Sequence, residues 1–348
     1  MASGGAELGD FKAFVAEHKD KVYSKIMEYL SIDAPKDFSE MMRSYVERKG
    51  QYRRPTYTIL WNLLYGGKNE DSLLPAAAQQ LSEDYFLMHD DWMDDNNIRR
   101  GLPTAHKLYG PEYAIDAGDA LQTILWRVAT DARDHLGAAR GRKYFDKFQD
   151  IMLVTHIGQY LDLKLTREFN DITKFTPDDY INSIHAKSAY YSVYGPMQCG
   201  AIIAGASDAD VAGIKSYGTL AGLAFQIKDD ILDCTSNEAT LGKTIGNDVK
   251  EGVKTMILWH AVHNADQHTL QRLKEIYGKK RHAKTKSDIG FALKKFDELG
   301  SIAFAEEEAQ RLMDEAMDLF EKETRKIKES KIKAIARASI SHTAKRSK

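Results

Sequence analysis

The chain has 348 residues, of which 43% are hydrophobic and 29% charged, and its 51 acidic and 49 basic side chains give a net charge of −2. This is the composition of an ordinary globular protein, and it excludes a chain that relies on a large overall charge to bind nucleic acid or a membrane surface. Cys199 and Cys234 show neither a disulfide framework nor the spacing of a metal site. The N-terminal residues lack a signal-peptide pattern, and no window approaches 18 consecutive apolar residues. We therefore expect a cytoplasmic protein with no nucleic-acid partner and no stable membrane insertion.

Long segments with a 3.6-residue hydrophobic period, seven prolines and no convincing alternating strand predict an all-α protein. Residues 11–30 and 301–323 each place apolar side chains near one helical face. Residues 113–129 and 213–232 carry apolar and small side chains on more than one face. This second pattern is typical of central helices that are packed on all sides.

The predicted helices are joined by polar or glycine- and proline-containing segments, none of which is long enough to separate domains. We therefore predict a single domain over residues 1–348, with a disordered N-terminus at 1–9 and a basic tail at 340–348. The last 28 residues hold ten Lys or Arg against three Glu. This end of the chain is either a solvated helix end with a frayed tail or a basic flap that reaches an anionic ligand.

Two clusters of three aspartates share one spacing, and they comprise Asp90, Asp91 and Asp94, and Asp229, Asp230 and Asp233. Neighbouring carboxylates about 4 Å apart repel by about 1 kcal/mol in water. A charge cluster is usually a solvated face, but the second cluster lies in a segment apolar enough to be a buried helix, where aspartates must be paired or metal-bound. Ligands that are all oxygen favour Mg²⁺, which bridges carboxylates to phosphates. Arg99 and Arg100 follow the first cluster and supply bidentate donors suited to phosphate.

The two clusters lie in motifs with a known counterpart. "DDWMDDNNIRRG" (90–101) resembles DDxxDxxxxRRG, the first aspartate-rich motif of the trans-isoprenyl diphosphate synthases, and "GLAFQIKDDILD" (222–233) resembles their second, GxxFQxxDDxxD. The resemblance extends over most of the chain, through "GQYLDL" (158–163), "AKSA" (186–189), "GKTIGND" (242–248) and "LGSIAFA" (299–305). It implies a farnesyl or geranylgeranyl diphosphate synthase, similar to archaeal members. The implied fold is an all-α isoprenoid-synthase bundle with a central cavity between the two motif-bearing helices, and the implied assembly is a homodimer.

The resemblance also implies a prenyltransferase that condenses an allylic diphosphate with isopentenyl diphosphate and depends on about three Mg²⁺ ions, with Mn²⁺ as another metal that oxygen ligands accept. By this resemblance Asp90, Asp94 and Asp229 are the direct metal ligands, and Asp91, Asp230 and Asp233 support them. Its catalytic residues include the cations that face the departing diphosphate, Arg99, Lys187 and Lys243. Gln226, also catalytic, orients the cluster together with Ser188 and Asp162.

Isopentenyl diphosphate is expected beside Arg100 and the segment "KGQYRRP" (49–55), where Gly50, Gln51 and Arg54 take the implied positions. Gln51 replaces the usual lysine. Glu83 stands where the family tends to have His or Gln, and a glutamate there is unfavourable unless Lys49 or Arg53 pairs with it. Val253 replaces the first of two usual lysines, which leaves Lys254 to bind substrate. These changes affect the isopentenyl diphosphate site more than the metal site.

Product length is expected to depend on Tyr85 and Phe86, one turn before Asp90, because two bulky rings on the cavity floor would stop the growing chain early. They favour farnesyl diphosphate, although they would also serve as ordinary core aromatics. "NNIRRGLPTAHKLYG" (96–110) is instead similar to archaeal members, many of which make geranylgeranyl diphosphate.

Two other classes stay open. A non-catalytic or regulatory subunit of a prenyl diphosphate synthase is suggested by Gln51, Glu83 and Val253, whereas the intact metal ligands together with Lys187 and Lys243 argue for catalysis. A class I terpene cyclase would share the first aspartate motif, but it would not be expected to keep the second motif or the RRG run.

Overall fold

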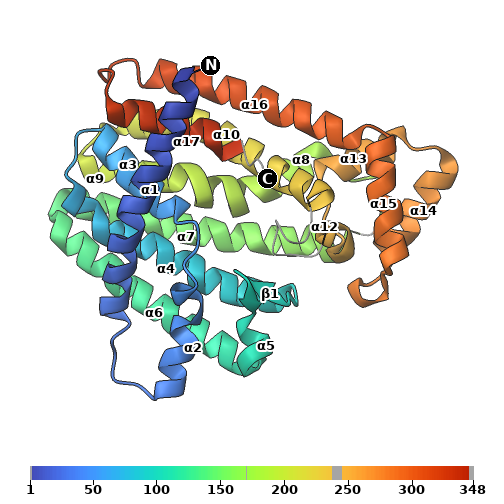
Figure 1. Ribbon diagram of the computed structural model, residues 1–348, viewed down its shortest axis with the longest axis horizontal. Helices are drawn as coiled ribbons and strands as arrows, with labels where there is room; N and C mark the ends of the chain where they lie inside the picture. The colour runs from blue at the N-terminus through green and yellow to red at the C-terminus, as the bar shows by residue number, and fades with distance from the viewer. Residues whose placement is uncertain (1, 170, 237–244, 345–348) are drawn as a thin grey trace. The chain divides into compact units, whose positions relative to one another are not determined.

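A computed structural model describes residues 2–169, 171–236 and 245–344. Within these residues all the regular secondary structure is helical except for one short hairpin, which confirms the all-α prediction (Figure 1). Contacts between residues group the chain into two compact units, and the single domain stays a prediction. The described residues of unit 1 fall within Met1–Asp150, Ser192–Lys215 and Phe320–Ser339, and those of unit 2 within Ile151–Tyr191, Ser216–Leu319 and Ile340–Lys348.

Unit 1 is built around helix α4, which packs against α6, α3 and α1. Its small buried side chains, Ala76, Ala77 and Ala78, allow this close packing. Helix α3 packs on α9, where a Cβ atom on Gly200 would lie 2.3 Å from the Thr58 carbonyl oxygen, so only glycine fits. The helices are α1 (Ala2–Tyr29), α2 (Lys36–Glu47), α3 (Arg53–Leu64), α4 (Asn69–Met93), α5 (Ala105–Tyr109), α6 (Pro111–Leu136) and α9 (Gly195–Ala204).

The hairpin of unit 1 joins strands β1 (Ile98–Arg99) and β2 (Leu102–Pro103) through a two-residue turn. Arg100 and Gly101 form this turn with φ angles of 52° and 79°. A tight hairpin whose twist matches its strands needs a positive φ at both central residues, which glycine adopts without strain. The turn therefore separates the two arginines of the "RRG" run, with Arg99 in a strand and Arg100 at the bend.

Unit 2 contains α8 (Pro177–Ile184), most of the π-helix η1 (His185–Tyr194), and the helices between residues 245 and 298. Helix α8 begins with a capping box between Thr176 and Asp179. Pro177 directly follows the cap, in the first turn, where proline is tolerated. The remaining elements are α12 (Asn247–Glu251), α13 (Met256–Asn264), α14 (Gln267–Gly278), η2 (Arg281–Ala283) and α15 (Lys286–Glu298), and α15 packs against α12, α13 and α14.

Four long helices contribute residues to both units, and they are α7 (Ala138–Arg167), α10 (Asp208–Thr235), α16 (Ser301–Glu323) and α17 (Lys331–Ala344). The bounds of α16 are those predicted from its hydrophobic period. Glycines in a left-handed conformation precede two long helices, Gly137 before α7 and Gly300 before α16. Gly137 lies in one of the glycine-containing segments predicted to join helices.

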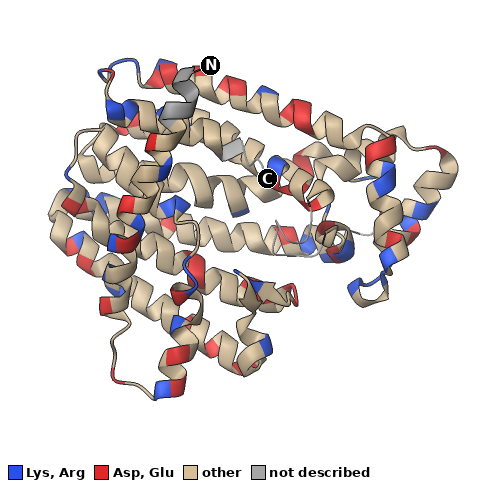
Figure 2. Cartoon of the chain, in the orientation of Figure 1, with Lys and Arg blue, Asp and Glu red and all other residues tan. Residues whose placement is uncertain are grey.

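Helices extend into both ends of the described chain. The structure has residues 2–9 in helix α1, where we expected disorder. Residues 331–344 form helix α17, so the predicted basic tail begins inside a helix. Acidic and basic residues are mixed along the helices of both units (Figure 2). No helix in the described part of the chain is long and apolar enough to cross a bilayer.

Candidate active site

The first aspartate motif lies where helix α4 ends. The N–H groups of Asp95 and Asn96 donate to carbonyl groups of the preceding turn, with Asp95 in a left-handed conformation (φ 47°). This is a Schellman ending, and aspartate is one of the few residues besides glycine that tolerates its geometry. Asp90 and Asp94 are half-buried in this last turn. The negative end of the helix dipole there disfavours carboxylates and favours a bound cation.

Asp91 differs from these neighbours because it is fully buried. Its carboxylate accepts hydrogen bonds from Arg99 Nε (2.9 Å), the Tyr45 hydroxyl (2.7 Å) and the Asn96 side-chain amide (3.0 Å). A metal ion could bind this carboxylate only after those bonds were broken. The contacts therefore fit the supporting role implied for Asp91 and not direct ligation. They also turn the Arg99 guanidinium, expected at the diphosphate, toward Asp91.

Arg100, expected at the isopentenyl diphosphate site, pairs with two acidic side chains of α4. Its Nη1 atom lies 2.8 Å from Asp84 Oδ1, and its Nη2 atom lies 3.5 Å from Glu83 Oε1. The other oxygen of Glu83 lies 3.0 Å from Arg54 Nη1. The partners of Glu83 are thus Arg54 and Arg100. Of the two cations considered as partners of Glu83, Lys49 pairs instead with Asp20.

The two carboxyl groups beside these arginines are perturbed in opposite directions. Burial raises the pKa of Glu83, but Arg54 and Arg100, with a smaller effect from Arg53, lower it more and leave it below its ordinary value. Burial raises the pKa of Asp84 to about 6, although Arg100 acts to lower it. Glu83 is therefore a carboxylate held ionised by arginines.

The remaining residues expected near this site take different positions. A Cβ atom on Gly50 would lie 2.5 Å from Arg100 Nη2, so a larger residue here would push this guanidinium group aside. Gln51 is exposed. Tyr85 is fully buried and stacks on Phe86 with ring centroids 4.4 Å apart, and Gln122 donates a hydrogen bond to its hydroxyl.

The second aspartate motif lies in the last two turns of α10, in unit 2. Asp230 is buried and accepts hydrogen bonds from the Tyr180 hydroxyl (2.6 Å) and from Gln226 Nε2 (2.9 Å). The Ser188 hydroxyl donates to Gln226 Oε1 (2.8 Å). Burial raises the pKa of Asp230 to about 7, against the lowering effect of the Tyr180 and Gln226 bonds, and the negative charges of the two other aspartates add to the rise.

The other two aspartates of this motif differ in exposure. Asp229 is half-buried, whereas Asp233 is buried and accepts a hydrogen bond from the Asp248 backbone N–H (3.0 Å). The Asp233 carbonyl accepts a second bond from the Gly246 N–H (2.9 Å). Asp233 therefore holds the end of the "GKTIGND" segment. Lys243, in the same segment, lies outside the described residues.

Lys187 lies in the π-helix η1, and its ammonium group is 2.6 Å from Asp162 Oδ2 on α7. A Cβ atom on Gly158 would lie 2.3 Å from the Lys187 backbone nitrogen, and one on Gly222 would lie 2.5 Å from the Ala189 Cβ atom. Helices α7 and α10 can therefore approach η1 closely only because both positions are glycine. π-Helical segments are rare and recur at functional sites.

Lys254, expected to bind substrate, is buried, and its ammonium group donates to the Thr166 carbonyl (2.9 Å) in the last turn of α7. Burial, followed by the nearby charge of Lys284, lowers the pKa of Lys254 to about 8. In this structure Lys254 caps a helix terminus.

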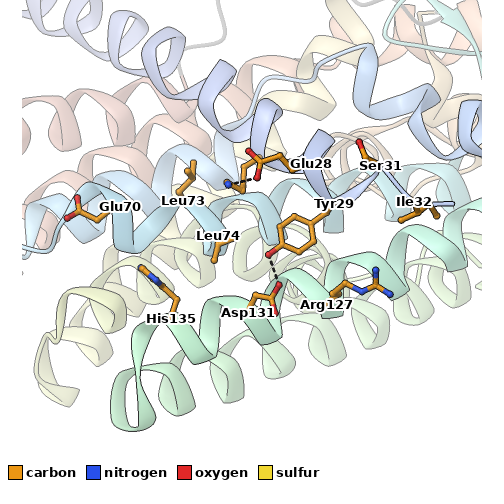
Figure 3. A pocket seen from close by; sticks show the side chains of 11 residues that line it. Glu28, Tyr29, Ser31, Ile32, Glu70, Leu73, Leu74, Arg127, Asp131 and His135 are labelled. Carbon is orange, nitrogen blue, oxygen red and sulfur yellow. Dashed lines mark hydrogen bonds and ion pairs between the residues drawn. The ribbon is translucent and has the colours of Figure 1, made fainter.

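Unit 1 contains a cavity of about 580 Å³. Side chains of α1, α4 and α6 line it, and the Tyr29 hydroxyl donates to Asp131 Oδ2 (2.6 Å) across it (Figure 3). No residue that lines it was predicted to bind substrate or metal.

Comparisons with known proteins agree with these motifs. The model of the polyprenyl synthetase family matches residues 35–295. The chain belongs to this family. A geranylgeranyl diphosphate synthase of Sulfolobus acidocaldarius is 36% identical over 249 residues, which cover 71% of this chain and 73% of that relative. A short chain isoprenyl diphosphate synthase of Methanothermobacter thermautotrophicus is 31% identical, over 75% of this chain and 78% of the relative.

A solved structure also resembles the chain over nearly its full length. The geranylgeranyl pyrophosphate synthetase of Pyrococcus horikoshii has a TM-score of 0.82 and 29% identity, and the match covers 97% of this chain and 99% of that one. This chain is thus a prenyltransferase with the all-α fold of the polyprenyl synthetases.

The acidic residues of this polyprenyl synthetase family member have the chemistry of a Mg²⁺ site, because all their ligand atoms are carboxylate oxygens. Burial is the main cause of the raised pKa of Asp230, and the negative charges of Asp229 and Asp233 add to it. Each unit contains one motif, and within the described residues no three acidic, histidine or cysteine side chains are grouped closely enough to hold a metal ion. That both motifs face one cavity stays a prediction.

Sequence reasoning missed Tyr45 and Tyr180, the hydroxyl donors to Asp91 and Asp230. Tyr45 lies in α2 and Tyr180 in α8, far along the chain from the carboxylates they contact. Neither belongs to a motif, so no local signal in the sequence pointed to them.

Proposed function

We propose that this prenyltransferase condenses an allylic diphosphate with isopentenyl diphosphate in a Mg²⁺-dependent reaction, with farnesyl or geranylgeranyl diphosphate as product. The observation that carries the proposal is a shared design of the two aspartate motifs. In each motif the second aspartate is buried and bound by a tyrosine hydroxyl from another helix, Tyr45 to Asp91 and Tyr180 to Asp230. The first aspartate, Asp90 or Asp229, is half-buried.

This arrangement supports a division of labour among the six aspartates. Asp90, Asp94 and Asp229 would hold Mg²⁺, while Asp91, Asp230 and Asp233 fix the helix ends through their hydrogen bonds. The metal ions would neutralise the charge that develops on the departing diphosphate. Arg99, Lys187 and Lys243 would add fixed positive charge there, and each 1.4 kcal/mol of stabilisation gained only in the transition state is about a tenfold rate increase. The pairing of Lys187 with Asp162 holds the ammonium group in place beforehand.

Product length would depend on the stacked rings of Tyr85 and Phe86. If the pair closes the floor of the allylic site, growth stops at farnesyl diphosphate. If the rings lie beside the growing chain, a fourth isoprene unit fits and the product is geranylgeranyl diphosphate. We further propose a cytoplasmic homodimer, as the family resemblance implies.

Incubation of the purified chain with Mg²⁺, isopentenyl diphosphate and each of dimethylallyl, geranyl and farnesyl diphosphate tests the proposal. Products are dephosphorylated and sized. We expect a single short-chain alcohol, and a longer one from a Tyr85→Ala, Phe86→Ala double variant, because removal of two rings deepens the floor. A hydrocarbon product would indicate a terpene cyclase. Absence of turnover with every primer, while Mg²⁺-dependent binding of allylic diphosphate persists, would indicate a non-catalytic subunit.

A further inference from the structure

The arginines expected to receive isopentenyl diphosphate are already neutralised in part by the protein. Arg54 lies 3.0 Å from one Glu83 oxygen and donates to the Ser192 hydroxyl (2.7 Å). Arg100 lies 3.5 Å from the other Glu83 oxygen and 2.8 Å from the fully buried Asp84. One glutamate thus bridges both guanidinium groups.

Glu83 differs from Asp84 in its access to solvent. The Glu83 side chain is 17% exposed, and those of Arg54 and Arg100 are 16% and 13% exposed, whereas Asp84 is completely buried. An anion that arrives from solvent can therefore reach the edges of both arginines, and it meets Glu83 there. Asp84 stays behind Arg100 as its internal partner.

A carboxylate and a diphosphate compete for the same donors. Both are acceptors suited to the forked guanidinium group, and two anions on the same arginines repel. In the structure the carboxylate of Glu83 already occupies these donors. The cost of binding a diphosphate therefore includes moving or protonating Glu83.

We propose that Glu83 is an internal counter-anion of Arg54 and Arg100, which the diphosphate of the homoallylic substrate must displace, and that it thereby sets the affinity of this subsite. Glu83 keeps both guanidinium groups oriented while the subsite is empty. Its negative charge weakens diphosphate binding in return. The inference rests on the proposed function, because that function assigns isopentenyl diphosphate to this subsite.

The test compares the full-length wild-type chain with Glu83→Gln, which keeps the side-chain length and one hydrogen-bond acceptor but removes the charge. Isothermal titration with inorganic pyrophosphate in metal-free buffer at low salt measures binding without the Mg²⁺ sites. We expect the Kd to fall about tenfold, which corresponds to about 1.4 kcal/mol. In turnover assays the KM for isopentenyl diphosphate falls by a similar factor, and the KM for the allylic substrate stays within about twofold.

Glu70→Gln is the matched control, because it makes the same change in charge on the same helix, about 20 Å along α4, and Glu70 is exposed. It should leave the pyrophosphate Kd within about twofold of wild type. A second control adds Arg54→Gln to the wild type and to Glu83→Gln. The increase in pyrophosphate affinity caused by Glu83→Gln should then largely disappear, because one of the two arginines for which the anions compete is gone.

Equal or weaker pyrophosphate binding by Glu83→Gln would overturn the inference and would show that Glu83 only orients the arginines. If this variant does not fold, as judged by circular dichroism, Glu83→Met provides the same comparison with an uncharged side chain of similar length. If the chain turns over its substrates but Glu83→Gln has the same pyrophosphate Kd as the wild type, this inference alone is wrong. If the chain shows no turnover but Glu83→Gln binds pyrophosphate more tightly than the wild type, the proposed function alone is wrong.

Discussion

At the scale of single residues, we expect two adjacent aspartates of the first motif to have different tasks. Asp91 has no exposed side-chain surface and compensates the charge of Arg99, which is itself 15% exposed. Asp90, the preceding residue, is half-buried at the end of the helix. When one partner of a buried ion pair is removed, the other charge is left without compensation, at a cost of about 3–5 kcal/mol.

Asp91→Asn should therefore lower the free energy of unfolding by about 3 kcal/mol, because Arg99 and Tyr45 lose their charged partner. Asp90→Asn should change it by less than about 0.5 kcal/mol and should instead weaken the Mg²⁺ dependence of turnover. Urea denaturation and Mg²⁺ titration of the two variants separate these effects. Equal stability of both variants would show that the Asp91 network carries no net stabilisation.

At the scale of elements, the position of Lys187 depends on how closely two helices approach the π-helix η1. Gly158 on α7 and Gly222 on α10 leave no space for a methyl group against η1. The backbone of η1 cannot move away freely, because Ala189 and Tyr191 of the same segment are buried. A small side chain at either glycine must therefore shift η1 and the residues it carries.

Gly158→Ala should reduce turnover by more than about tenfold, because its Cβ atom would displace the Lys187 backbone and thus the ammonium group. The KM for isopentenyl diphosphate should change little. The matched control is Gly290→Ala in α15, where an added Cβ atom meets nothing within 4 Å. That variant should gain about 0.5–1 kcal/mol of stability from helix propensity and keep its activity. Wild-type turnover in Gly158→Ala would contradict the role given to close packing.

At the scale of the whole molecule, the C-terminal helix is part of the packed structure despite its basic composition. Ile335, Ala336 and Ile340 of α17 are buried. The ammonium group of Lys333 is buried as well and donates to the Thr324 and Ile327 carbonyls that follow α16. Arg337 pairs with Glu321 and Glu329. The charges of Lys333 and Arg337 are thus used to cap a helix end and to form ion pairs.

Truncation after Ser330 should therefore lower the free energy of unfolding by about 3–6 kcal/mol, the contribution expected from two buried isoleucines at about 1.5–3 kcal/mol each. Lys331→Gln is the control, since the Lys331–Asp10 pair is exposed and such pairs contribute about 0–1 kcal/mol. Thermal and urea unfolding of both variants provide the measurement. A truncated chain as stable as the wild type would favour the frayed tail considered from the sequence.

The sequence by itself determined the helical fold, the bounds of α16, the family and the two aspartate motifs. These properties are encoded locally, by a 3.6-residue period and by residues at short fixed spacings. Only the tertiary structure decided which aspartates are buried, that Tyr45 and Tyr180 hold them, and that Glu83 bridges Arg54 and Arg100. Consecutive residues of a helix point about 100° apart, so packing against other helices chooses which one faces inward. Those partners come from distant segments, and no local pattern specifies them.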